Sequence, residues 1–254
     1  SITTLFTWYN SPGFNCILLF MYCASKDVPN MVQLLPFYRI LGTMIYRLGL
    51  LAVFAVSHFA ACSTRRLPDE LKRRIQDTLA REPGVFAVAF KDLSTGEEIL
   101  INERETFHAA STMKVPVMIG LYRLALAGRF TMSDPVLVKN SFKSIVDSST
   151  YSLDSTDDSD KELYKAIGTH RSMQELIYSM TTRSSNLATN MLIALADGRN
   201  VTKAMRELGA EDIQVLRGVE DDKAFQKGLN NTTTAYDLMV IFEKIAEGKA
   251  ITGV

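Results

Sequence analysis

The chain has 254 residues, enough for one large domain or two small ones. Hydrophobic residues make up 47% and charged residues 22%, and 28 basic side chains balance 28 acidic ones. This zero net charge gives no support to a nucleic-acid partner and excludes a largely disordered chain. Three cysteines and three histidines, without a cluster at metal-ligand spacing, argue against a disulfide scaffold and a zinc site.

The first 61 residues differ from the rest, because they contain only four charged side chains. Arg47 precedes the apolar run 48–61, which ends in Ala60-Ala61 before Cys62. A positive residue, an apolar run and small residues before a cleavage point are typical of a signal peptide, which we predict over 44–61. The small residues before the cysteine resemble a bacterial lipoprotein box, which implies that Cys62 is lipidated.

Two alternatives stay open for this run: a plain secretory signal, and a membrane anchor, although a span needs about 20 apolar residues. Met44 is a natural start for a signal peptide. Residues 1–43 show no clear helical or strand period, and we treat them as a doubtful N-terminal extension. The mature domain is then expected over 62–254.

The elements after this leader predict a mixed α/β (α+β) domain. An amphipathic helix is expected over 67–82, followed by strands at 85–90 and 99–102 that form an antiparallel hairpin. The Ser/Asp-rich segment 141–161 is expected to be an irregular loop outside the core. A short strand is expected at 136–139. Further helices are expected at 111–126, 172–180, 185–197, 200–208 and 232–247.

The chemistry is concentrated in Ser111-Thr112-Met113-Lys114, an S-x-x-K at the start of a predicted helix. Residues three apart share a helix face, so the Lys114 ammonium can reach the Ser111 hydroxyl. A serine hydroxyl needs a nearby base to become a nucleophile, and a lysine with a depressed pKa can supply one. Such a pattern also arises by chance, with Ser111 as a helix cap and Lys114 as a solvated charge.

The run from Phe107 to Pro116 resembles the active-site segment of class A β-lactamases and related penicillin-recognising serine hydrolases. The S-D-N element of that family resembles Ser184-Ser185-Asn186 in this chain. The resemblance implies that Ser184 passes a proton to the leaving nitrogen and that Asn186 binds the substrate amide. Ser185 departs from the motif, which puts the local packing around the usual aspartate in doubt. His108 is expected to be structural.

The family also has a glutamate that activates the deacylating water, in an R-x-E-x-x-L-N segment. Here Arg217 is followed by Glu220, one residue late, whereas the register of Leu229-Asn230 places Gln226 at the glutamate position. A neutral amide cannot take a proton from water. Either Glu220 is the base in a remodelled loop, or deacylation is slow.

The resemblance implies a β-lactamase/transpeptidase-like fold, with an antiparallel sheet flanked by helices and an all-helical subdomain. No Lys-Thr-Gly follows before Val254, so we expect the C-terminal strands to be missing. The expected protein is an exported serine hydrolase, periplasmic or anchored through Cys62, that acts on β-lactams or acyl-D-alanyl peptides without metal or organic cofactor. A penicillin-binding or peptidase-like enzyme with slow deacylation, and a non-catalytic envelope lipoprotein, are the alternatives.

Overall fold

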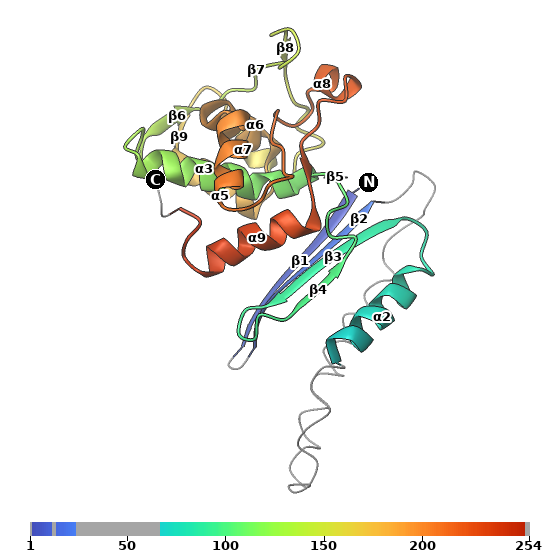
Figure 1. Cartoon of the computed structure of the whole chain (residues 1–254). Helices are drawn as coiled ribbons and strands as arrows, with labels where there is room; N and C mark the ends of the chain where they lie inside the picture. The colour runs from blue at the N-terminus through green and yellow to red at the C-terminus, as the bar shows by residue number, and fades with distance from the viewer. Residues whose placement is uncertain (1, 12–13, 24–66, 252–254) are drawn as a thin grey trace, which may run out of the picture. The chain divides into compact units, whose positions relative to one another are not determined.

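The computed structural model describes residues 2–11, 14–23 and 67–251 (Figure 1). The predicted signal peptide at 44–61 and Cys62 lie outside these residues. The chain divides into two compact units. Of the described elements, the first unit contains helix α2, and the second contains strands β1 and β2 together with the chain from Phe86 onward. Within the described ranges, no helix is long and apolar enough to cross a membrane.

Helix α2 (Leu67–Leu79) confirms the predicted amphipathic helix and ends three residues earlier than expected. Asp69 and Glu70 lie in its first turn, where negative charge favours the helix dipole. The end of the predicted range falls in a turn before Pro83, which cannot continue a helix.

The predicted hairpin is confirmed by strands β3 (Val85–Asp92) and β4 (Glu98–Ile101), which pair antiparallel with Val88 opposite Ile101. The centre of β3 is fully buried, as expected for its apolar run. Strand β3 also connects to helix α9 (Ala235–Ala246), because Lys91 forms an ion pair with Glu243 at 2.9 Å.

Residues 1–43 gave no strand period, yet the structure places β1 (Ile2–Ser11) and β2 (Phe14–Cys23) there. The four strands form one sheet in the order β1-β2-β3-β4. Both segments are rich in β-branched and aromatic residues, which favour strands even where polar and apolar residues do not alternate. The sheet therefore uses a part of the chain that the sequence pattern left unassigned.

Helix α3 (Lys114–Leu126) is packed against α5 (Met173–Thr182), α6 (Asn186–Ala196) and α7 (Gly198–Glu207). Figure 1 shows this helical block, and its helices were all predicted. The core of the block includes the fully buried Leu121 and Leu192.

Short elements bring distant segments to the block. Strand β5 (Phe107–His108) pairs with β10 (Thr232–Thr233), so that the chain before Ser111 lies beside the chain after the Glu220 loop. The predicted strand at 136–139 is found as β6 (Pro135–Leu137), which pairs with β9 (His170–Ser172). The predicted last helix begins later, at α9, because Thr234 caps it and the two preceding threonines form β10. Two short helices, α4 (Lys161–Lys165) and α8 (Asp222–Gln226), lie in the connections between these elements.

The prediction that segment 141–161 lies outside the core was wrong. It contains the paired strands β7 (Phe142–Lys143) and β8 (Thr150–Tyr151). Phe142 and Leu153 are buried in the main core cluster. The segment is Ser/Asp-rich because many of its polar side chains bond to nearby backbone groups, as Asp154 does with the N–H of Thr156.

Candidate active site

Ser111 lies in a 3₁₀ turn, η2 (Ala110–Met113), that leads directly into α3. Its side chain is exposed. The residue before it, Ala110, has a left-handed backbone with φ of 46°. The N–H of Ala110 donates to His108 Nδ1 at 3.1 Å, which gives this histidine the expected structural role. The turn thus presents the Ser111 hydroxyl at the start of a buried helix.

Lys114 is the buried charge of the site, with 5% of the residue exposed. Its Nζ donates to Ser184 O at 2.7 Å, to Ser184 Oγ at 2.9 Å and to Asn186 Oδ1 at 3.1 Å. Three donated bonds are those of an ammonium. Burial lowers the pKa of Lys114 to about 8, and the charge of Asp158 opposes this shift. The lysine is therefore close to the point at which it can exchange a proton near neutral pH.

Ser184 connects the two halves of the S-x-x-K motif. Its Oγ lies 3.2 Å from Ser111 Oγ and accepts from Lys114 Nζ. The hydrogen bonds of Lys114 thus reach Ser111 through Ser184, where the motif spacing predicted direct contact. Ser184 itself has φ of 56°, a left-handed conformation that places both its carbonyl and its hydroxyl on the lysine. Backbone strain of this kind is typical of functional sites.

Ser185, the departure from the S-D-N pattern, is fully buried and begins α6. Its Oγ accepts from the N–H of Ala188, as a helix N-cap does. A carboxylate is also present at this helix start, because Asp158 Oδ2 accepts from the N–H of Leu187 at 2.8 Å. The backbone N–H groups at this helix start are therefore bonded by two separate side chains, the Ser185 hydroxyl and the Asp158 carboxylate.

The structure brings Glu220, not Gln226, to the site. Asn186 Nδ2 donates to Glu220 Oε1 at 3.4 Å, whereas Gln226 is exposed at the end of α8. Glu220 is half-buried, and burial raises the pKa of its carboxyl above the usual value. Its backbone is left-handed as well, with φ of 61°. A carboxyl group therefore lies one side chain away from the lysine.

The loop that carries Glu220 is held by residues that the sequence reasoning missed. Asn190 on α6 accepts from the N–H of Val219 and donates to its carbonyl at 2.9 Å. Asn231 Oδ1 accepts from the N–H groups of Leu216 and Arg217. Asn190 could have been suspected, because it is a polar residue within a largely apolar helix sequence. Asn231 carried no such signal.

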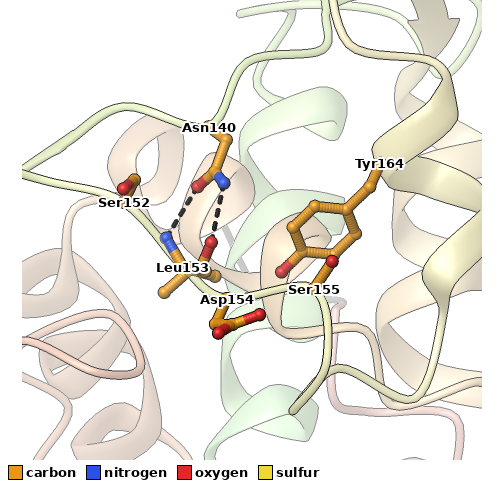
Figure 2. Close-up of a pocket in the computed structure, with 6 residues that line it drawn as sticks. All are labelled: Asn140, Ser152, Leu153, Asp154, Ser155 and Tyr164. Carbon is orange, nitrogen blue, oxygen red and sulfur yellow. Dashed lines mark hydrogen bonds between the residues drawn. The ribbon is translucent and has the colours of Figure 1, made fainter.

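The Ser/Asp-rich segment 141–161 forms one side of the site. The Asp154 backbone N–H bonds to Glu220, and Tyr151 OH accepts from Asn190 Nδ2 at 3.3 Å. Figure 2 shows the open depression on this side of the site, where the Asn140 side chain bonds the backbone of Leu153 in both directions. The lining residues are Asn140, Ser152, Leu153, Asp154, Ser155 and Tyr164.

Among the residues that the structure describes, no group of three or more His, Cys, Asp or Glu side chains is placed to hold a metal ion. The arrangement can instead perform acid–base and nucleophilic chemistry with its own side chains. It contains an exposed hydroxyl, a hydroxyl that links it to a buried amine, an amide and a half-buried carboxyl group. This is the set required for acyl transfer in two steps.

Comparison with protein families shows to which family the chain belongs. The model of the β-lactamase enzyme family matches residues 70–253, well over half of the chain. The chain belongs to this β-lactamase family. The predicted membership of the β-lactamase-like serine hydrolases and the β-lactamase-like fold are thereby confirmed.

Solved structures show the same fold. PBP-A is 22% identical, with a TM-score of 0.57 over 72% of this chain. A β-lactamase from Chitinophaga pinensis is 17% identical, with a TM-score of 0.59 over 72%. The TLA-3 extended-spectrum β-lactamase is 18% identical, with a TM-score of 0.60 over 73%. The chain spans 63% to 65% of the length of these proteins. No curated protein matches the chain.

Proposed function

We propose that this β-lactamase family member hydrolyses β-lactams through an acyl-enzyme on Ser111. The observation that carries the proposal is the hydrogen-bonded chain from Ser111 Oγ through Ser184 Oγ to Lys114 Nζ. A PBP-A mutant of the same fold has been solved as an acyl-enzyme complex with penicillin G. At 25% identity, that protein supports the acyl-enzyme as the intermediate to test.

In the acylation step, Ser111 Oγ attacks the lactam carbonyl carbon, and its proton passes through Ser184 to a neutral Lys114 amine. With a pKa of about 8, about one Lys114 in ten is neutral at pH 7. The C–N bond of the lactam then breaks, and the same proton returns from Lys114 through Ser184 to the leaving nitrogen. Asn186 binds the substrate amide, and the start of the helix favours the developing negative charge.

In the deacylation step, Glu220 takes a proton from a water molecule, and the hydroxide attacks the ester carbonyl. The ester bond to Ser111 breaks, and the proton that Glu220 took from the water passes to Ser111 Oγ, which restores both groups. Glu220 suits this role because burial raises its pKa toward the working range of a general base. Its bond to Asn186 joins it to the hydrogen-bonded groups around Lys114.

A second function is favoured by the register of this glutamate. Glu220 lies one residue later than the family segment places it and contacts Asn186 at the long distance of 3.4 Å. If this geometry does not activate water, the protein is a penicillin-binding or D-alanyl peptidase-like enzyme with a stable acyl-enzyme. A non-catalytic envelope lipoprotein would form no acyl-enzyme.

The test is mass spectrometry of the whole chain after brief exposure to a penicillin, with Ser111→Ala as control. An adduct on Ser111 that disappears while hydrolysed drug accumulates supports the β-lactamase. An adduct that persists identifies the penicillin-binding enzyme instead. If the wild-type chain and Ser111→Ala both remain unmodified, the acyl-enzyme mechanism is wrong.

We also propose that the protein is exported and lipidated on Cys62, because the apolar run 48–61 and the small residues before Cys62 match a lipoprotein signal. Expression in a bacterium with a labelled fatty acid tests this directly. Label on the wild-type protein, with none on Cys62→Ala, is the expected result. An unlabelled protein that retains residues 44–61 would support the membrane anchor.

A further inference from the structure

Asp158 is a buried carboxylate that the sequence motifs do not include. Only 3% of it is exposed, although it lies in the Ser/Asp-rich excursion. Oδ2 accepts from the N–H of Leu187 at 2.8 Å and from Tyr164 OH at 3.1 Å, and Oδ1 accepts from the N–H of Asp160 at 2.9 Å. These three donors are neutral, so the hydrogen bonds satisfy its oxygens without supplying a positive charge. A charge so deeply buried is costly unless something nearby balances it.

The position of Asp158 relates it to the catalytic lysine. Leu187 directly follows Asn186, so the carboxylate holds one end of the turn whose other groups accept from Lys114. The charge of Asp158 raises the pKa of Lys114, against the effect of burial. Ser185, which lies between the catalytic residues of this turn, caps the helix but carries no charge.

We propose that Asp158 is a positioning residue for acylation, which fixes the Ser184–Leu187 turn and supplies the negative charge that balances the Lys114 ammonium. Its place in acylation rests on the proposed function, whereas its effect on Lys114 does not. The carboxylate thus comes from a distant segment of the chain and reaches the helix start from the 141–161 excursion.

Other charged groups surround Lys114 and must be separated from Asp158. Glu220 approaches from the 217–220 loop and bonds the Asn186 amide. Asp160 is engaged by Ser179 Oγ and lies 3.4 Å from Arg183 Nη1. Asp157 is exposed beside Asp158, and its charge affects the pKa of Glu220. Asp157 therefore provides a matched control that changes charge without changing the buried carboxylate.

The experiment compares Asp158→Asn and Asp158→Ser with Asp157→Asn in the whole chain. The asparagine variant keeps an oxygen that can accept from Leu187, the serine variant keeps a shorter hydroxyl, and neither carries a charge. The pKa of Lys114 is measured by NMR on protein with carbon-13 in the lysine ε-position, and the Lys114→Arg spectrum identifies the signal. We expect both Asp158 variants to lower the pKa of Lys114 by about one unit, the usual effect of a nearby charge, and Asp157→Asn to leave it unchanged.

The second readout is the pH profile of acylation by a penicillin. The rising limb should move to lower pH by the same amount in the Asp158 variants, which a loss of packing alone would not cause. An unchanged Lys114 titration in a folded Asp158 variant overturns the proposal. Failure of both variants to fold also overturns it, because Asp158 is then a folding residue. If the wild-type chain forms no adduct, the proposed function fails, yet the NMR titration still decides whether Asp158 sets the charge of Lys114.

Discussion

Gly218 lies against the side chain that holds the Glu220 loop, and replacing it with alanine tests that support. A Cβ on Gly218 would lie 2.8 Å from Asn190 Cγ and still closer to Asn190 Oδ1, nearer than non-bonded atoms approach. Asn190 is 2% exposed, and its amide makes two bonds to the backbone of Val219 and donates a third to Tyr151 OH. The added methyl must therefore displace either the amide or the loop.

The magnitude follows from these contacts. Each lost hydrogen bond costs about 1 kcal/mol, and a buried amide left without partners costs more. We expect Gly218→Ala to lower the free energy of unfolding by about 2–3 kcal/mol. Asn190→Ala removes the two bonds to Val219 together with the bond to Tyr151, and it also makes room for the methyl. In that background, Gly218→Ala should cost less than about 0.5 kcal/mol.

Urea denaturation of the four proteins in this double-mutant cycle gives the coupling energy. The activity readout is the lifetime of the penicillin adduct, which should lengthen in Gly218→Ala because Glu220 moves while Ser111 does not. Stability costs that simply add, from Gly218→Ala and Asn190→Ala, would refute the reasoning. They would show that the methyl is accommodated without touching the amide.

Three further results follow from the site. Glu220→Gln should form the penicillin adduct on Ser111 at a near-normal rate but slow its hydrolysis by at least about 100-fold, as for loss of a general base. Equal adduct lifetimes in this variant and the wild-type chain, measured by stopped flow or mass spectrometry, would show that Glu220 takes no part in deacylation. Ser184→Ala should slow acylation by about 100-fold or more, because the proton path to Lys114 is cut, with circular dichroism as the check on folding. The acylation rate of the wild-type chain should rise about tenfold per pH unit below pH 8 and level off above it, because the neutral form of Lys114, whose pKa is about 8, is the base. A flat profile from pH 6 to 8 would exclude Lys114 as the base of acylation.

The sequence predicted those parts of the structure that local chemistry determines. Helices α3, α5, α6 and α7 were found where the apolar period placed them. The two motifs also meet as their resemblance implied, with Lys114 bonded to Ser184 and Asn186. Predictions from short motifs at helix starts succeed because the backbone and side-chain geometry there is set within a few residues. The first turns of α3 and α6 lie side by side in the structure, because Lys114 bonds to Ser184 and Asn186.

The remaining parts depend on contacts between distant segments. Asp158 lies 29 residues from the N–H it holds, and Asn190 lies 29 residues from Val219. A polar-rich segment such as 141–161 reads as a solvated loop, because composition does not reveal that a carboxylate will be buried under a helix start. Strands β1 and β2 were missed for a related reason, since the pairing of β2 with β3 and of β1 with β2 is decided by the rest of the sheet.

The strained backbone before the nucleophile allows a last prediction. Ala110 has φ of 46°, whereas its neighbour Ala109 is helical with φ of −66° and fully buried. A left-handed alanine costs about 1–2 kcal/mol, which glycine avoids, while glycine adds about 0.5–1 kcal/mol of unfolded-state entropy. Ala110→Gly should therefore leave stability unchanged or raise it by up to about 1 kcal/mol, whereas Ala109→Gly should lower it by about 1 kcal/mol or more.

Acylation should respond in the opposite sense to stability. Glycine at position 110 lets the 3₁₀ turn sample conformations in which Ser111 Oγ leaves Ser184, so we expect Ala110→Gly to acylate more slowly at equal or greater stability. Thermal unfolding and adduct formation on the same samples measure both. If Ala110→Gly is as destabilising as Ala109→Gly, the left-handed residue is not strained, and its position before the nucleophile follows from packing alone. If it is stable but acylates normally, the strain is present but does not serve to aim Ser111.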